Sequence, residues 1–340
     1  MTASDPQPIT GQTATPTPDV READRLCAHL KTVQQEIARI IFGQERVINQ
    51  TLTAILAGGH GLLVGAPGLG KTLLVTTLGT VLGLDARRVQ FTPDLMPSDI
   101  TGSEILDEDA AGHRSFRFVP GPVFCQLLMA DEINRASPRT QSALLQAMQE
   151  RRVAIAGTDH ALPYPFHVLA TQNPLEQEGT YPLPEAQLDR FMLQIPLNFP
   201  DEAAERAMLL ATTGAESTTA QPVMTPQDLL AAQFLVRTLP VGDKVVDAIL
   251  KLVRSARPET TYDDTLRNQI AWGPGPRAAQ ALMLATRARA LLDGRLSPNL
   301  DDVIALAHPV LAHRMSLTFA ARADGVQLDA VITQLLKHLG

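Results

Sequence analysis

The chain has 340 residues, of which 45% are hydrophobic and 19% are charged, a composition typical of a soluble globular protein. That length is enough for two domains, each with its own hydrophobic core. The 29 basic and 36 acidic residues give a net charge of −7, which argues against non-specific nucleic-acid binding but leaves room for a local basic patch. The two cysteines, Cys27 and Cys125, cannot form the spacing of a metal or redox motif.

Two further features concern the cellular location. The sequence has no apolar run near the ~20 residues that a helix needs to cross a bilayer. The N-terminus also lacks the charged and then apolar segment of a secretory signal. We therefore expect a cytoplasmic protein without a membrane span.

The first elements can be taken in chain order. Residues 1–20 are mostly Thr, Pro, Gln and Ala, and their low apolar content predicts a disordered tail. Apolar residues then recur at helical spacing between Arg21 and Ile40, and a second helix is expected from Val47 to Leu56. A glycine-rich break separates this helix from a short apolar strand over Gly61–Val64.

The next segment, Gly65–Thr72, reads Gly-Ala-Pro-Gly-Leu-Gly-Lys-Thr and matches the phosphate-binding pattern G-x-x-x-x-G-K-[ST]. It lies between an apolar strand and a predicted helix, which is the setting such a loop needs. Lys71 can reach the β- and γ-phosphates and the Thr72 hydroxyl can ligate Mg²⁺. The alternative, a glycine-rich turn with an exposed lysine, is disfavoured by this setting. The residues expected to hold ATP and Mg²⁺ here are Gly65, Pro67, Gly68, Gly70, Lys71 and Thr72.

A second motif follows about sixty residues later. The apolar run Gln126–Ala130 predicts a buried strand, and it ends in Asp131 and Glu132. Acidic side chains at the carboxyl end of such a strand project into the crevice where α/β sheets bind ligands. We expect Asp131 to hold the Mg²⁺ shell and Glu132 to orient and polarise the attacking water. An apolar run before Asp-Glu can also be a solvated helix start, which the preceding phosphate loop disfavours.

Three more short strands are expected at 88–91, 167–171 and 191–197, so that five strands alternate with helical segments. This order predicts an α/β fold, with a mainly parallel sheet sandwiched by helices. Two β-hairpin inserts are expected at about 103–118 and 151–165.

The character of the sequence changes after Pro200, where Ala and Leu recur with helical periodicity. We therefore predict a large α/β ATPase domain over 21–200 and a helical domain over 201–340. Two helix starts are expected, at Thr225-Pro226 and at Ser297-Pro298, because each has a capping residue followed by proline.

The order of these motifs resembles the MoxR group of AAA+ ATPases, from about residue 21 to 320. The resemblance implies a P-loop NTPase fold with a C-terminal helical lid. It is carried by two sets of motifs: Met-Ala-Asp-Glu-Ile-Asn-Arg-Ala at 129–136 with Thr-Gln-Ser-Ala-Leu-Leu at 140–145, and Ala-Thr-Gln-Asn-Pro at 170–174 with Glu-Gln-Glu-Gly-Thr-Tyr at 176–181 and Leu-Asp-Arg-Phe at 188–191.

The resemblance also implies roles for two polar residues. Asn173 resembles the sensor-1 residue, whose amide holds the attacking water or touches the γ-phosphate. From the residues alone, a turn former before proline is the alternative for Asn173. Arg190 resembles the arginine finger, which a neighbouring subunit supplies in trans to stabilise charge on the transferred phosphoryl group. From the residues alone, Arg190 can be a surface arginine that pairs with Asp189.

Two further positions rest on the resemblance. Arg277, in Gly-Pro-Arg-Ala, resembles the sensor-2 arginine of the lid, which reaches back to the γ-phosphate; Gly275 stands where a serine commonly precedes the proline. Gly43 lies in a turn that resembles the adenine side of the nucleotide site, and a plain helix-ending glycine is an alternative. The two hairpins resemble inserts that line or cap a ring's pore, or they are structural lids.

The resemblance implies a Mg-ATP-hydrolysing homo-oligomeric ring, expected to be a hexamer. MoxR-type ATPases act as chaperones that mature or activate a target protein complex, often with a partner that has a von Willebrand factor A domain. A nucleic-acid motor or loader of the helicase-related branch is an alternative, which the acidic composition disfavours. A subunit of a magnesium-chelatase-like complex is another.

Overall fold

A five-stranded sheet forms the centre of the computed structural model, which describes residues 20–108, 113–175, 179–214, 219–337 and 339. Every neighbouring pair is parallel, in the order β2-β5-β8-β1-β9. The predicted parallel α/β sheet is therefore confirmed. The strands are β1 (Gly61–Val64), β2 (Ala86–Gln90), β5 (Leu127–Asp131), β8 (His167–Gln172) and β9 (Leu193–Pro196).

Two parts of the sequence interpretation fall outside this description. The tail predicted over 1–20 is not described before Val20, where the first helix begins. The motif residues 176–178 also lie outside the described residues.

Helices cover both faces of the sheet, because successive strand residues point to opposite faces. Leu63 and Met129 enter a hydrophobic cluster with α1, α2 and α3, whereas Leu62 and Leu128 enter a second cluster with α5. Both faces of the sheet are thus covered by helices. The loops that can carry functional residues lie at the two ends of the strands. These helices are α1 (Val20–Ala38), α2 (Glu45–Leu56), α3 (Lys71–Val81) and α5 (Pro138–Glu150).

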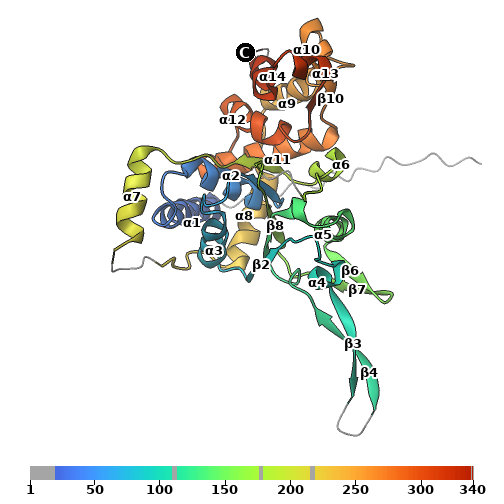
Figure 1. Cartoon of the computed structure of the whole chain (residues 1–340). Coiled ribbons are helices and arrows are strands. Elements are labelled where there is room, and N and C mark those ends of the chain that lie inside the picture. Colours follow the sequence, from blue (N-terminus) through green and yellow to red (C-terminus); the bar gives the residue numbers. More distant parts are fainter. Residues whose placement is uncertain (1–19, 109–112, 176–178, 215–218, 338, 340) are drawn as a thin grey trace, which may run out of the picture.

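Antiparallel hairpins lie in both ranges where inserts were expected. The first, β3–β4, projects from the body of the molecule (Figure 1). Phe118 of β4 stacks on His160 of β7 with ring centroids 3.9 Å apart, so the two hairpins are joined by an aromatic contact. The elements are α4 (Pro97–Thr101), β3 (Gly102–Glu108), β4 (Arg114–Pro120), β6 (Arg152–Ile155) and β7 (Thr158–Ala161).

The chain after Pro200 is mainly helical, as its periodicity predicts. α8 packs against α1 and α2, and Gln233 Nε2 donates to the Ile55 carbonyl at 2.9 Å. One hydrophobic cluster therefore runs from α1, α2 and α3 through α8 into α11, α12 and α14. The elements are α7 (Glu202–Thr212), α8 (Pro226–Thr238), α9 (Asp243–Ser255), α10 (Asp264–Gln269), β10 (Ile270–Trp272), α11 (Pro276–Leu292), α12 (Leu300–Leu311), β11 (Ser316–Leu317), α13 (Phe319–Ala323) and α14 (Leu328–Lys337).

One predicted helix start is present and the other is wrong. Thr225 caps α8, and its side chain and Asp228 bond reciprocally to each other's backbone N–H. The start predicted at Ser297-Pro298 is two residues too early, because Asn299 caps α12 through a similar exchange with Asp302. At this position the Asn-x-x-Asp capping pattern, rather than Ser-Pro, therefore sets the first residue of the helix.

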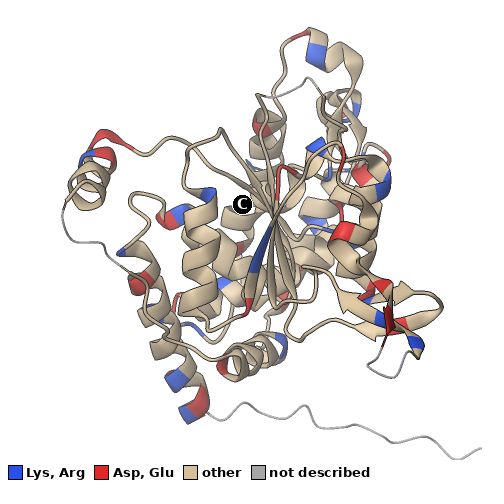
Figure 2. Cartoon of the chain, turned by 60° about the horizontal axis from the view of Figure 1, so that its bottom comes forward, with Lys and Arg blue, Asp and Glu red and all other residues tan. Residues whose placement is uncertain are grey.

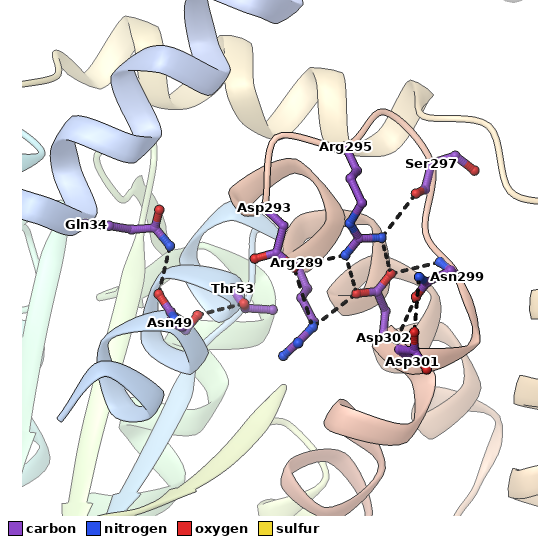
Figure 3. Close-up of polar contacts among 10 residues, drawn as sticks. All are labelled: Gln34, Asn49, Thr53, Arg289, Asp293, Arg295, Ser297, Asn299, Asp301 and Asp302. Atoms are coloured by element: carbon purple, nitrogen blue, oxygen red, sulfur yellow. Dashed lines mark hydrogen bonds and ion pairs between the residues drawn. The ribbon is translucent and has the colours of Figure 1, made fainter.

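Asp302 also joins the two long lid helices, as Figure 3 shows. Its side chain is only 1% exposed, and its Oδ1 lies 2.6 Å from Arg295 Nη2 and 3.1 Å from Arg289 Nε. Because Arg289 lies on α11 and Asp302 on α12, this buried carboxylate fixes the angle between the two helices.

Charged residues of both signs are intermixed over the helices and hairpins (Figure 2). The ribbon of the described residues in this view thus carries no long stretch of one charge sign. Within the described ranges, no helix combines the length and the apolar character needed for a membrane crossing.

Candidate functional site at the carboxyl ends of the strands

The phosphate loop connects β1 to α3 at the carboxyl end of the sheet. Gly68 and Gly70 have φ values of 82° and 74°, in the left-handed region that favours glycine. A Cβ added at either residue would meet no atom within 4 Å, so the space over the loop is open. The backbone N–H groups of the loop and the first turn of α3 can therefore receive the phosphates of a nucleotide.

Lys71 begins α3 and extends across this loop. Its Nζ donates to the Gly65 carbonyl at 2.7 Å, which keeps the ammonium group within the loop. Gly65 itself packs so tightly against Leu197 that an added Cβ would lie 2.8 Å from two of its atoms. The glycine at this position is therefore required by the close contact between the loop and the segment after β9.

The turn that contains Gly43 is tied to the same loop. Gln44 Nε2 donates to the Leu69 carbonyl at 3.1 Å. Gly43 has φ of 66°, and a Cβ there would collide with Ala204 in the first turn of α7. This turn therefore borders the phosphate loop, on the side where the resemblance expects the adenine.

Asp131 ends β5 and is held by two neighbouring strands. Thr171 of β8 donates to its Oδ1 at 2.6 Å, and Arg88 of β2 donates to its Oδ2 at 2.6 Å. Its side chain is 11% exposed, so the carboxylate has a fixed position and one accessible side. A carboxylate oxygen is the kind of donor that suits a Mg²⁺ ion held mainly by phosphates and water.

Throughout the part of the chain that the structure describes, no three His, Cys, Asp or Glu side chains are grouped so as to hold a metal. In phosphoryl-transfer sites in general, Mg²⁺ bridges phosphate oxygens of the nucleotide itself.

Glu132 follows directly and has an unusual backbone. Its φ is 54°, a left-handed conformation that a non-glycine residue rarely adopts, and its N–H donates to Thr171 Oγ1 at 2.8 Å. The carboxylate Oε2 accepts from Gln90 Nε2 at 2.7 Å and from Arg135 Nη1 at 3.2 Å. Strained backbone of this kind is concentrated at functional sites.

Asn173 follows β8, the strand between β5 and β1. It is 4% exposed, and its Oδ1 accepts a hydrogen bond from the N–H of Leu175 at 3.1 Å. Asn173 therefore forms a local turn and also lies at the sheet edge shared by Asp131 and the phosphate loop.

Arg190 and Arg277 lie at the opposite end of the sheet, near the amino ends of the strands. Arg190 precedes β9, where the Met192 N–H donates to the carbonyl of His60, immediately before β1. Arg190 and Arg277 both line a small cavity of about 140 Å³ there, and Arg277 Nη1 lies 3.7 Å from Asp189 Oδ2. The short helix before this segment is α6 (Glu185–Leu188).

This position bears on the role expected for Arg277. β1 has four residues, so the Cα atoms at its two ends are about 10 Å apart at ~3.3 Å per residue. Arg277 lies beside Asp189 near the amino end, and the phosphate loop follows the carboxyl end, so the two lie at opposite ends of β1. The reason is that α11 packs on α2 and begins beside Asp189, which periodicity alone does not encode.

Comparisons with known proteins agree with this site. Residues 60–193 match the model of the ATPase family associated with various cellular activities (AAA), and residues 265–335 match an AAA lid domain. Chaperone MoxR1 of Mycobacterium tuberculosis is 40% identical over 93% of this chain and 84% of its own length. The chain belongs to the MoxR family of AAA+ ATPases.

Other members of the MoxR family and a solved structure extend the comparison. Protein MoxR of Paracoccus denitrificans is 31% identical over 86% of this chain and 89% of its own length. A crystal structure from Cytophaga hutchinsonii, described as an ATPase, is 37% identical, with a TM-score of 0.87 over 94% of this chain and 96% of its own. Nucleotide binding with a divalent cation and ATP hydrolysis follow in general terms from this family.

Sequence reasoning missed two residues of this MoxR-family site, Arg88 and Gln90, which contact Asp131 and Glu132. Both lie on β2 with one residue between them, so they share a face of the strand. The register that brings them there pairs Gln90 with Asp131, although the two are far apart in sequence. An alternating polar pair on a short strand was the available signal.

Proposed function

We propose that this protein hydrolyses Mg-ATP, to ADP and phosphate, at the contacts between copies of itself in a hexameric ring. The observation that carries this proposal is the division of the site between the two ends of the strands. The carboxyl ends carry the phosphate loop, Asp131 and Glu132, whereas Arg190 and Arg277 lie at the amino ends. A head-to-tail contact between two chains brings the carboxyl ends of one sheet toward the amino ends of the other.

Within one chain, the residues at the carboxyl edge bind the nucleotide and activate water. The loop N–H groups and Lys71 bind the phosphates, and Thr72 and Asp131 would hold Mg²⁺. The cation would neutralise charge on the phosphates when bound. Glu132 polarises the attacking water once its carboxylate is released from Gln90, and Asn173 orients that water from the adjoining strand.

Arg190 and Arg277 act on the nucleotide of the neighbouring chain. Guanidinium groups there would stabilise the charge that develops on the transferred phosphoryl group. Their shared position beside Asp189 supports a common direction of approach. For Arg277 this replaces the role within its own chain that the sequence suggested.

The work of the ring is proposed from the relatives. MoxR1 carries the name of a chaperone, which supports a role in maturing or activating a target protein complex. A von Willebrand factor A domain protein as partner is proposed from the resemblance of the motifs alone. The projecting β3–β4 hairpin, whose Phe116 is 72% exposed, is a suitable contact for such a protein.

The shared site is tested by mixing two inactive variants. Lys71→Ala cannot bind ATP but keeps Arg190, whereas Arg190→Ala binds ATP but lacks the finger. If the site is shared, mixed oligomers regain part of the ATPase activity that neither variant has alone. Absence of any gain, with mixed oligomers present on size-exclusion chromatography, would refute the shared site.

The target is tested separately with a Glu132→Gln trap. This variant keeps ATP bound, so a pull-down in Mg-ATP, compared with ADP, retains the assembled ring on its target. Enrichment of a von Willebrand A-domain protein or a protein complex supports the chaperone role. Enrichment of nuclease-sensitive nucleic acid contradicts it.

A further inference from the structure

Arg314, just after α12, is a buried arginine whose hydrogen bonds are all satisfied. Its side chain is 2% exposed, and each of its five N–H groups has an oxygen acceptor. One of these bonds, from Nη1 to the Val310 carbonyl at 2.7 Å, lies within the lid. The other four cross to the large domain.

Those four bonds converge on the segment Asp189–Met192. Arg314 Nε donates to Asp189 Oδ1 at 2.7 Å, and Nη2 donates to the Asp189 carbonyl at 3.2 Å. Nη2 also donates to the Phe191 carbonyl at 2.6 Å, and Nη1 to the Met192 carbonyl at 3.1 Å. Arg190 lies between the residues that accept these four hydrogen bonds.

A second lid side chain contacts the same segment. His313 Nε2 lies 2.9 Å from the Phe191 carbonyl. Burial keeps the pKa of His313 well below its usual value, so the imidazole is neutral and donates through Nε2. Two consecutive lid residues therefore hold the backbone directly after Arg190.

The segment lies between α6 and β9 and is held from two sides. Its N–H groups bond within the large domain, to α6 carbonyls and to the His60 carbonyl. Its carbonyls at Asp189 and Phe191 accept from the lid, so Arg314 holds the acceptor side of the backbone on both sides of Arg190. Arg277 of the same lid adds a contact to Asp189 at 3.7 Å.

We propose that Arg314 is a positioning residue that sets Arg190 for the neighbouring chain's nucleotide and makes Arg190 move with the lid. This inference rests on the proposed role of Arg190 in trans. A displacement of the lid shifts Arg190 and Arg277 together, because both are tied to Asp189. Lid position in one chain therefore controls hydrolysis in the next.

The first test is Arg314→Lys, since lysine keeps the charge but has three donors and no planar fork. The expected result is a fall in kcat of about 10- to 100-fold, because a misplacement near 1 Å has effects of that size. KM for ATP and binding of a fluorescent ATP analogue stay within about twofold, since the chain's own loop is untouched. The control is Arg322→Lys, an exposed arginine of α13, which should not change kcat.

The second test separates positioning from a general loss of folding. Arg314→Lys is mixed with Lys71→Ala, which supplies an undisturbed Arg190. If Arg314 acts through Arg190, turnover by the Arg314→Lys chains rises severalfold in mixed rings. If it stays low while the Arg190→Ala and Lys71→Ala mixture regains activity, the inference about Arg314 is wrong and the shared site survives. If neither mixture gains activity, the proposed function fails with it.

A double variant gives an independent check. Arg190→Ala combined with Arg314→Lys should be no slower than Arg190→Ala alone, because a positioning residue has nothing left to position. A further loss of tenfold or more would show that Arg314 acts on something other than Arg190.

Discussion

Gln90 Nε2 donates a hydrogen bond to Glu132 Oε2 at 2.7 Å, so the strand beside β5 holds the carboxylate proposed to activate water. Arg135 Nη1 lies 3.2 Å from the same oxygen. A carboxylate oxygen polarises water best when its lone pairs are not already accepting hydrogen bonds. Oε2 already accepts two hydrogen bonds, so we expect Glu132 to polarise water more strongly when Gln90 does not bind it.

A Gln90→Leu variant should raise the ATPase rate measured without any target protein. Removing one hydrogen bond to a charged acceptor, about 1.5 kcal/mol, corresponds to an increase of roughly 10-fold. The rate is measured by phosphate release at saturating Mg-ATP. Arg87→Gln is the matched control, because Arg87 lies on the same strand but pairs with Asp85 instead. A lower rate in Gln90→Leu would mean that Gln90 orients Glu132 rather than restraining it.

A Glu132→Gln variant should lose hydrolysis while it keeps ATP bound. The amide cannot accept a proton from water, so turnover falls by about 10²- to 10⁴-fold. Binding of a fluorescent ATP analogue should change little, because the loop and Lys71 are intact. If turnover falls less than tenfold, another group activates the water and the role assigned to Glu132 is wrong.

The local motifs explain why some of this site could be predicted from sequence. The phosphate loop, Asp131 and Glu132 are contiguous, so their residue types and their neighbours in the chain carry the information. Gln90 could not be assigned, because its contact depends on β2 pairing with β5. Likewise Asp189 and Arg314 are 125 positions apart in the sequence, and their hydrogen bond forms only because the lid packs on the large domain.

The position of Arg277 shows the same limit in a different way. Its motif indicated a lid arginine, but which nucleotide it faces depends on how the lid sits on the large domain. Helix α11 packs against α2, which places the start of α11 at the amino edge of the sheet. That arrangement arises because several helices bury their apolar faces together. The sequence of one apolar face does not specify which helix packs against it.

The ion pairs of Asp302 predict a large effect on stability (Figure 3). Replacing Asp302 by Ala leaves Arg289 and Arg295 without their buried carboxylate and removes the hydrogen bond that Asp302 accepts from the N–H of the cap residue Asn299. Because the two arginines are 39% and 35% exposed and stay solvated, we expect the free energy of unfolding to fall by about 1.5–3 kcal/mol, the range for hydrogen bonds to a charged group. Asp301→Ala, at the adjacent exposed position, is the control and should change it by less than about 1 kcal/mol. Denaturant unfolding measures both, and similar values for the two would contradict a structural role for Asp302.

The buried His167 predicts how stability depends on pH. His167 is 2% exposed, its Nδ1 lies 2.8 Å from the Gly59 carbonyl, and its Nε2 lies 3.0 Å from Gln233 Nε2. Both contacts are satisfied by a neutral ring that donates through Nδ1 and accepts at Nε2. Burial lowers the pKa of His167 to about 4, so the folded protein keeps this ring unprotonated under conditions in which the unfolded chain binds a proton.

The sign of the effect follows from the proton count. Between about pH 6.5, the usual value for histidine, and the lowered pKa of about 4, the unfolded state holds one more proton at this site. The free energy of unfolding therefore falls as pH falls through this window, by about 1.4 kcal/mol per pH unit from His167. A His167→Asn variant should show a pH slope smaller by that amount in denaturant unfolding at pH 5 to 6. An unchanged slope would mean that His167 takes up its proton in the folded protein as well, and that burial does not hold the ring neutral.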